Sequence, residues 1–525
     1  MRDPILTLII LALLPACYFR PYVGLLTFTW LAYMRAQDLC WGFARTMRFS
    51  FFVSLALILG FLVNERGKAL FLRDLRCWII FALPLLSALS ISTSITGFDV
   101  WVTNYYIEYV KVIFIALITT TLLDTRNKLR WFCWTIALSL GFYGIKTGIF
   151  GVLTGGQARI MQGPGGMLED NNDFALALVM SIPIMFYLGF SEGSARVRSF
   201  TYAGVALTMF TVVLTHSRGG FLSMVGVLGM MIWRSKRRMQ GVAVGIAVGL
   251  VGLAVVPQSF IERIGTLENP NAEASSRSRL EAWGIALQVI SEHPWLGVGM
   301  RNFELAYAQM DVSKQVGGAE EVRTIVVHNS YLQVWAEQGS IAFALYLTLL
   351  LSTFWMLGQV RREARRSGAR PWILDYARMF EASLFGFVIG STFLNRATFD
   401  LMYHIIVASV VFKHLARREM RGEVIWEVGV VQAPREVAFR PRYGFGRRGA
   451  LEPALAATTP RSEARAGFGT RAEAAPAAEA EPEGRPGFGA RRETPGGSSE
   501  PPLLPETRGG RSWAEPARRP RWGRR

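Results

Sequence analysis

Long apolar segments recur through this chain between polar connections, and they constrain its fold more than any other feature. They occupy residues 4–19, 22–34, 48–63, 77–95, 105–123, 130–150, 174–190, 199–215, 219–233, 241–256, 340–357, 379–393 and 402–413. Because the bilayer core offers no water to backbone groups, segments that cross it must be helices or the strands of a closed barrel. The short alternating strands of a barrel do not occur in the sequence. The sequence therefore predicts an all-α polytopic membrane protein with about 12 or 13 transmembrane helices.

The net charge of +18 does not imply a nucleic-acid partner, because Lys and Arg concentrate in short loops and in the C-terminal region. Positively charged loops of membrane proteins face the cytoplasm. The loops that this rule places there lie at 126–130, 196–198, 234–238 and 361–370. The opposite side then holds residues 96–104, 151–173, 216–218, 257–339 and 394–401.

The chain divides into four parts by composition. Residues 1–256 hold the N-terminal transmembrane helices, and 257–339 form a polar loop too long to be a mere connection. Residues 340–416 hold the C-terminal transmembrane helices. Residues 417–525 are rich in Arg, Ala, Pro and Gly, cannot bury enough apolar surface to fold, and are predicted to form a disordered cytoplasmic tail.

The tail repeats the pattern R-x-G-F-G-x-R at 442–448, 465–471 and 485–491. Such repeats could bind a cytoplasmic partner or anionic lipid headgroups. They could equally be low-complexity drift without a function.

The polar loop has the pattern of short helices. Apolar residues recur at helical spacing at Leu280, Trp283, Leu287 and Ile290. They predict an amphipathic helix that stops at His293-Pro294, because proline excludes the residue before it from the helical region. Asn302 is placed to cap a second helix, and a third opens near Asn329 and ends at Gly339. His328 then stands at the junction of loop and helix.

Cations on the non-cytoplasmic side are candidate ligands for an anion. The loop contains more acidic than basic residues, so its few arginines are candidate anion ligands. They are Arg277, Arg279, Arg301 and Arg323. Arg218 lies in a separate loop and is followed by Gly219 and Gly220, which let a ligand approach the backbone closely. A guanidinium can bind an oxyanion through two hydrogen bonds.

Acidic and amide side chains gather just before the segment that begins at Phe174. The candidates for binding a glycan or an acceptor are Glu169, Asp170, Asn171 and Asn172, together with Asn329 beside His328. Such a cluster could bind sugar hydroxyls. It could instead cap the helix that starts at Phe174.

These residue types suit the transfer of a group from a phosphate-activated donor in the membrane. Arginines can neutralise a leaving diphosphate, and an imidazole can take a proton from an attacking hydroxyl. ATP is not available on that side, so the donor must carry its own activation, as a polyprenyl diphosphate glycan does. A lone histidine is nevertheless more often structural, and an arginine at a membrane boundary often pairs with headgroups. The sequence contains no P-loop, H-E-x-x-H, C-x-x-C or nucleophile elbow, so neither a metal nor a cofactor is expected.

Four motifs carry a family resemblance. They are Ser217-Arg218-Gly219, Ser278-Arg279-Leu280-Glu281-Ala282-Trp283, His293-Pro294-Trp295-Leu296-Gly297-Val298-Gly299 and His328-Asn329-Ser330-Tyr331-Leu332-Gln333. With the many spans and the large loop, residues 1–415 resemble the O-antigen ligase and polymerase superfamily. The ligase pattern is met at His328, Asn329 and Gly339, while its last position holds Ala342. The segments 41–44 and 163–173 resemble the O-glycosylation ligases associated with exosortase systems.

The resemblance implies a multi-span, GT-C-like glycosyltransferase and a metal-independent, inverting reaction without a cofactor. His328 would activate the acceptor hydroxyl, and Arg218 and Arg279 would bind the diphosphate of an undecaprenyl-linked glycan. The acceptor would be a hydroxyl of a lipid, a polysaccharide or a protein. The implied location is the bacterial inner membrane, with the large loop periplasmic, membrane lipids around the helices and the tail cytoplasmic.

Three other functions fit parts of the sequence. A polymerase that joins one lipid-linked repeat to another is built from similar parts. A transporter or flippase would use ionisable residues in mid-membrane, such as Glu108 and Lys111, although these two could simply pair with each other. A scaffold would act through the tail and would lose its function when residues 417–525 are deleted.

Overall fold

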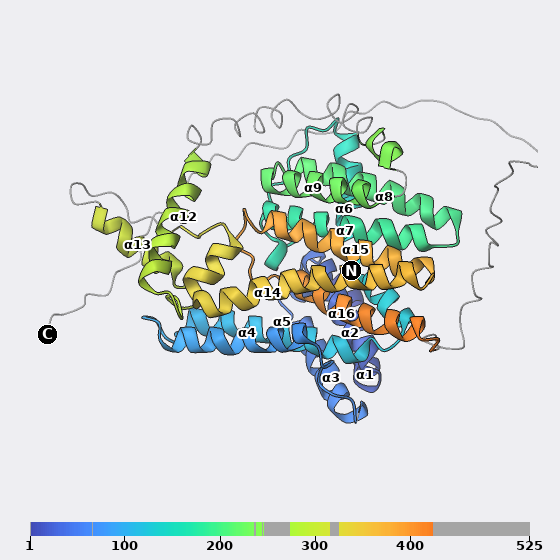
Figure 1. Ribbon diagram of the computed structural model, residues 1–525, viewed down its shortest axis with the longest axis horizontal. Coiled ribbons are helices and arrows are strands. Elements are labelled where there is room, and N and C mark those ends of the chain that lie inside the picture. Colours follow the sequence, from blue (N-terminus) through green and yellow to red (C-terminus); the bar gives the residue numbers. More distant parts are fainter. Residues whose placement is uncertain are drawn as a thin grey trace, which may run out of the picture. The chain divides into compact units, whose positions relative to one another are not determined.

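The computed structural model describes residues 2–65, 67–235, 238–243, 245, 274–314 and 325–423. Its helices are α1 Arg2–Phe19, α2 Pro21–Met34, α3 Phe49–Asn64, α4 Leu75–Ser92, α5 Val100–Leu122, α6 Arg126–Leu153, α7 Asn171–Ser191, α8 Ala195–Leu214, α9 Arg218–Arg234, α12 Ala274–Glu292, α13 Phe303–Lys314, α14 Ser330–Arg366, α15 Pro371–Gly390 and α16 Asp400–Met420 (Figure 1). Apart from an isolated bridge between Gln162 and Asp170, the regular structure of the described residues is helical.

The predicted fold class is confirmed. Within the described residues, seven helices are long and apolar enough to cross a membrane, namely α1, α4, α5, α6, α7, α8 and α14. Every apolar segment of the sequence coincides with a helix except 241–256, which lies mostly outside the described residues. The protein is therefore a polytopic α-helical membrane protein, and the total of about 12 or 13 spans stays a prediction.

Helix α7 forms the centre of the bundle. It packs against α6, α8, α9 and α15, and 83% of its apolar window is buried inside the protein. By contrast, only 17% of the α1 window is buried. A helix that is apolar on all sides must be enclosed either by protein or by lipid. The composition of α7 and α1 is similar, so their neighbours decide which of these environments each helix occupies.

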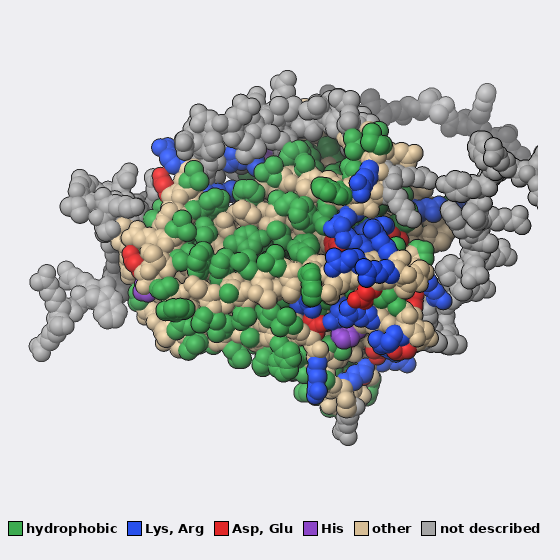
Figure 2. Space-filling model, viewed as in Figure 1, with side chains coloured by type: hydrophobic (Ala, Val, Ile, Leu, Met, Phe, Trp, Pro, Cys, Tyr) green, Lys and Arg blue, Asp and Glu red, His purple; other side chains and the backbone are tan. Residues whose placement is uncertain are grey.

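The positively charged loops lie together at one end of the bundle, as predicted. Glu381 of α15 pairs with Arg361 of α14 at 2.5 Å and with Arg234 of α9 at 3.6 Å. Arg126, at the start of α6, stacks on the ring of Trp372 at the start of α15, 4.4 Å from its centroid. Figure 2 shows the densest group of Lys and Arg side chains at the right of the view. We call this the arginine-rich end.

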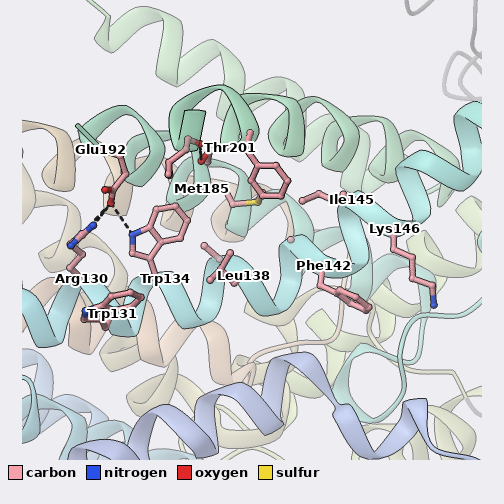
Figure 3. Close-up of a pocket in the computed structure, with 14 residues that line it drawn as sticks. Arg130, Trp131, Trp134, Leu138, Phe142, Ile145, Lys146, Met185, Glu192 and Thr201 are labelled. Carbon is pink, nitrogen blue, oxygen red and sulfur yellow. Dashed lines mark hydrogen bonds and ion pairs between the residues drawn. The ribbon is translucent and has the colours of Figure 1, made fainter. Parts of the chain in front are cut away.

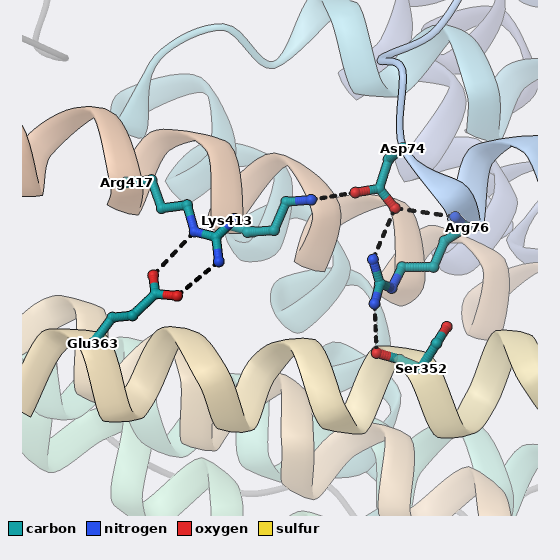
Figure 4. Close-up of polar contacts among 6 residues, drawn as sticks. All are labelled: Asp74, Arg76, Ser352, Glu363, Lys413 and Arg417. Atoms are coloured by element: carbon teal, nitrogen blue, oxygen red, sulfur yellow. Dashed lines mark hydrogen bonds and ion pairs between the residues drawn. The ribbon is translucent and has the colours of Figure 1, made fainter.

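A buried ionic cluster joins three helices near the arginine-rich end (Figure 4). The Asp74 carboxylate accepts a hydrogen bond from Arg76 at 3.0 Å and also pairs with Lys413 of α16. Arg76 in turn donates to the Ser352 carbonyl of α14 at 2.6 Å. Asp74 and Arg76 are each 6% exposed. One carboxylate therefore holds α4, α14 and α16 together.

The helix α16 extends past the predicted start of the tail at residue 417. It ends at Met420, and Arg417 pairs with Glu363 of α14 at 2.7 Å (Figure 4). This ion pair gives the last turn of α16 a tertiary partner, which composition alone does not reveal. The rest of the predicted tail, with its three repeats, lies outside the described residues.

Two helices of the polar loop were predicted at the right places. The structure has α12 at Ala274–Glu292 and α13 at Phe303–Lys314. The apolar face assigned to the first helix is partly wrong, because Leu280 and Leu287 are exposed. The buried positions include Ala282 and Ala286 instead. Ala282 and Ala286 are buried in one cluster with Phe303 and Tyr307 of α13 and Ala336 of α14.

An apolar cavity of about 600 Å³ opens between α6, α7 and α8. Figure 3 shows the Arg130–Glu192 pair at one end of its lining and Lys146 at the other. The helices α6 and α8 approach closely at Gly148, where a Cβ would lie 2.5 Å from the Leu207 carbonyl oxygen. The cavity is lined by α6, α7 and α8 and holds none of the predicted site residues.

Replacing Asp74 should destabilise the protein more than any single exposed charge does. Asp74→Ala leaves the buried Arg76 and Lys413 without their carboxylate, and breaking a buried pair in this way costs about 3–5 kcal/mol. Equilibrium unfolding in detergent, followed by circular dichroism, measures the loss. Glu423→Gln is the control, since Glu423 pairs with Arg418 and Arg421 at the surface. Equal stability of the two variants would contradict the assigned role of Asp74.

Candidate functional site

The loops predicted to share the non-cytoplasmic side meet at the end of the bundle opposite the arginine-rich end. The Asn171 side chain donates to the Thr215 carbonyl at 2.8 Å, so the loop before α7 contacts the loop before α9. The Ser330 N–H donates to the Ser391 carbonyl at 2.8 Å, so the start of α14 contacts the α15–α16 connection. The ion pair of Arg396 with Asp173 ties that connection to α7. These contacts bring four separate chain segments together.

His328 stands at the junction of loop and helix, as predicted. The next residue, Asn329, caps α14, because its Oδ1 accepts from the N–H groups of Tyr331 at 3.0 Å and Leu332 at 3.2 Å. The preceding carbonyl, that of Val327, accepts from Trp283 Nε1 of α12 at 3.0 Å. His328 itself has φ of +51°, a left-handed conformation that is uncommon outside glycine. Contacts on both sides therefore hold the histidine in a strained position, which is frequent at functional sites.

Arg279 and Asp170 both act on the His328 imidazole. Burial and the positive charge of Arg279 lower the pKa of His328, while the negative charge of Asp170 opposes them. His328 is only partly buried, so one side remains accessible. The three residues lie 49 or more positions apart in the sequence, and the structure brings them within electrostatic range. The lowered pKa favours the neutral imidazole, which is the form that accepts a proton.

Arg218 begins α9 in the same region. Ser217 caps this helix by accepting a hydrogen bond from the Gly220 N–H at 3.1 Å. Gly219 faces Phe393 of the α15–α16 connection, and a Cβ on it would lie 3.1 Å from the Phe393 Cβ. The guanidinium of Arg218 is partly exposed at the start of a helix whose N-terminal dipole favours anions.

The remaining predicted cations have other surroundings. Arg277 is exposed on α12, and Arg323 lies outside the described residues. The Arg301 guanidinium lies over the rings of Trp101 and Tyr105, 5.4 and 5.1 Å from their centroids, and 3.5 Å from the Glu304 carboxylate. The contacts of Arg301 are thus with α5 and α13, and its predicted diphosphate contact stays a prediction.

The acid and amide cluster does cap a helix, but that helix begins at Asn171 rather than at Phe174. The Asp170 carboxylate accepts from the Asn172 N–H at 2.8 Å and from the Asn172 side chain at 3.0 Å. The Asn171 side chain donates its hydrogen bond to the Thr215 carbonyl. Glu169 is exposed. The capping interpretation therefore explains Asp170, and the binding of a glycan by this cluster stays a prediction.

Sequence reasoning missed the two most enclosed charged groups at this end. Asp173 is 4% exposed and Arg396 is its partner. Glu337 of α14 is 3% exposed, accepts a hydrogen bond from Gln333 at 3.3 Å and lies within electrostatic range of Arg301. A charged residue in a short connection between two apolar segments, such as Arg396, carries no specific signal in a single sequence, because such connections are commonly charged. Among the described residues, no group of three or more His, Cys, Asp or Glu side chains could hold a metal ion.

The fold and this site define a polytopic membrane protein with a polar, partly enclosed site at one end of its helical bundle. Residues 203–347 match the O-Antigen ligase family. This segment includes Arg218, Arg279, Arg301 and His328, and the match supports placing the chain in the O-antigen ligase superfamily. Residues 1–192 match a family of unknown function, DUF5935.

An uncharacterised protein from Haemophilus influenzae is 26% identical to this chain over 173 residues. The alignment covers 30% of this chain and 43% of the relative. The chain thus spans less than half the length of that relative.

The charges around His328 predict opposite shifts of the pH profile of activity. If His328 acts as a general base, activity rises with pH as its imidazole becomes neutral, and the lowered pKa of His328 puts that rise below pH 6.5. Asp170→Asn removes the negative charge, lowers the pKa further and moves the rise to lower pH, while asparagine keeps the helix cap. Arg279→Gln removes the positive charge and moves the rise to higher pH. Initial rates of the catalysed reaction between pH 4.5 and 8 measure both shifts, and shifts in the same direction would contradict the geometry.

Proposed function

We propose that this protein is an O-antigen ligase-like membrane glycosyltransferase that moves a glycan from a polyprenyl diphosphate carrier to an acceptor hydroxyl. The observation that carries this proposal is His328, a strained and partly enclosed histidine within electrostatic range of Arg279. It lies inside the segment that matches the O-Antigen ligase family. A neutral imidazole beside a guanidinium suits a reaction in which a proton leaves one group and negative charge develops on another.

His328 acts as the general base of the transfer. The imidazole takes the proton of the acceptor hydroxyl while the hydroxyl oxygen forms a bond to the anomeric carbon of the glycan. The bond from that carbon to the diphosphate oxygen breaks, and its electron pair leaves with the diphosphate. Attack from the side opposite the leaving group inverts the anomeric centre. Asn329 positions the base, because its side chain is engaged in capping α14.

Arg218 and Arg279 bind the diphosphate and neutralise the charge that develops on it. Guanidinium groups can do this without a metal ion, since each offers paired N–H donors to phosphate oxygens. Arg277 and Arg301 are further cations of the same end. Glu169, Asp170, Asn171 and Asn172 lie beside them, and a glycan that extends from the diphosphate would reach the exposed members of this group.

The distribution of charge supports a location in the bacterial inner membrane with the site on the periplasmic side. The arginine-rich end faces the cytoplasm under the positive-inside rule, which places the site and the large loop outside. The tail after α16 then starts in the cytoplasm. The acceptor is a hydroxyl of a lipid, a polysaccharide or a protein, and protein O-glycosylation alongside an exosortase system is the form that the sequence motifs favour.

Substitution of the three central residues tests the proposal. His328→Ala should lower glycan transfer by about 10²- to 10⁴-fold through loss of the base. Arg218→Ala and Arg279→Ala should each lower it by about 10²- to 10³-fold through loss of charge stabilisation. Transfer is measured with purified full-length protein, a polyprenyl diphosphate-linked glycan and candidate acceptors.

His293→Ala is the matched control, because His293 is an exposed histidine of the same loop. Thermal unfolding in detergent verifies that each variant is folded. Full transfer by folded His328→Ala protein would refute the mechanism. A product that carries one glycan supports a ligase, whereas a ladder of glycan lengths would identify a polymerase.

A further inference from the structure

The connection between α15 and α16, residues 391–399, holds the start of α14 in place. The Ser330 N–H donates to the Ser391 carbonyl at 2.8 Å, and the Ser330 hydroxyl donates to the Leu394 carbonyl at 2.7 Å. The Arg396 N–H donates to the same hydroxyl oxygen at 2.8 Å. Ser330 is fully buried and lies two positions after His328. We call residues 391–399 the hub loop.

The hub loop also contacts other segments of the site. Phe393 packs against Gly219, next to Arg218. Thr398 shares a hydrogen bond of 2.7 Å with the Tyr105 hydroxyl of α5. The hub loop thus lies between the residues that carry the proposed base and one of the proposed diphosphate ligands.

Arg396 is the charged residue of the hub loop. Its guanidinium pairs with the carboxylate of Asp173 in the first turn of α7. The Asp173 side chain is 6% exposed and the Arg396 side chain is 28% exposed. Burial alone would lower the pKa of Arg396, but the hydrogen bond and charge of Asp173 outweigh it and raise the pKa. The Arg396 guanidinium is therefore charged, held by one carboxylate and still partly exposed.

Asp170 links Arg396 to the proposed base. It acts electrostatically on His328 and also on Arg396. A guanidinium has five N–H donors, and a single carboxylate cannot use them all. Arg396 and His328 thus share Asp170 as an electrostatic neighbour.

We propose that Arg396 is a further anion-binding residue of the site, which contacts the diphosphate of the lipid-linked donor and is oriented by Asp173. This inference rests on the proposed function and deepens it, because it gives the leaving group a third cation. Asp173 fixes the plane of the guanidinium, so that the remaining donors are already directed when the phosphate oxygens arrive.

The same geometry would result if the ion pair only joined the hub loop to α7. The protein provides a matched pair for this comparison at the arginine-rich end. Arg130 of α6 pairs with Glu192 after α7, with side chains 26% and 17% exposed (Figure 3). Arg130→Ala therefore removes an arginine of similar exposure from a similar ion pair, at the end away from the site.

Binding of farnesyl diphosphate, a short polyprenyl diphosphate, tests the proposal without requiring activity. Isothermal titration of full-length protein in detergent compares wild type, Arg396→Ala, Arg396→Lys, Asp173→Asn and Arg130→Ala, with farnesol as the ligand that lacks phosphate. Arg396→Ala should weaken binding of farnesyl diphosphate by about 10- to 100-fold, as expected for a lost charge-assisted hydrogen bond. Arg396→Lys should keep part of the affinity, and Asp173→Asn should weaken binding less than Arg396→Ala. Arg130→Ala should bind as wild type does, and farnesol should not distinguish the variants.

Wild-type affinity for farnesyl diphosphate in folded Arg396→Ala protein would overturn the proposal, as would an equal loss in Arg130→Ala. The proposed function fails in a different way. Full transfer by His328→Ala refutes the mechanism whatever Arg396 does, and an inactive His328→Ala variant with unaltered binding in Arg396→Ala refutes only the role of Arg396. A wild-type protein that does not bind the diphosphate contradicts both.

Discussion

The need to satisfy backbone polar groups inside the bilayer governs the whole structure. Helices do this within each segment, so irregular backbone is confined to helix ends or to places where other protein groups supply partners. The site is therefore assembled from helix ends. The non-glycine residues with positive φ among the described residues are Arg35, His216, Arg301 and His328, and each lies in a connection beside a helix end. Backbone strain is therefore concentrated in these connections, where side chains from different segments meet.

Charge is used differently at the two ends of the bundle. At the arginine-rich end, carboxylates such as Asp74 and Glu381 pair with two cations each, and the pairs join helices. At the opposite end, His328 and Arg279 lie within electrostatic range and share a partly enclosed space. The two arrangements fit a structural role for the first end and the proposed anion-binding role for the second.

The sequence predicted what local rules determine. The helical spacing of the apolar residues and the proline at position 294 predicted α12 and its end at Glu292. The cap at Asn329 predicted the start of α14. The sequence could not predict which face of α12 is buried, because that depends on the surface of α14. Asn302 directly precedes α13, as predicted, but the hydrogen bond of 2.8 Å that its Oδ1 accepts from Thr96 could not be predicted. The pairing of Arg396 with Asp173 joins residues 223 positions apart, and no pattern in a single sequence encodes such a contact.

The break in α14 shows how one sequence motif positions the proposed base. Gly339 has φ of +78° and ψ of 178°, so the helix that starts at Ser330 stops there, as predicted, before the span continues. The break frees the carbonyls of Ala336 and Glu337, and the N–H groups of Val298 and Gly299 bond to them at 3.0 and 2.9 Å.

The turn at 293–299 also fits against the break sterically. A Cβ on Gly339 would lie 2.0 Å from the Trp295 carbonyl oxygen, and one on Gly297 would lie 2.5 Å from the Ala336 carbonyl oxygen. Glycine at both positions is thus required for the close approach. Since the turn fixes the far end of the first segment of α14 and Asn329 caps its near end, His328 is set by contacts at both ends of one short helix. A base held in this way needs little rearrangement when an acceptor hydroxyl arrives.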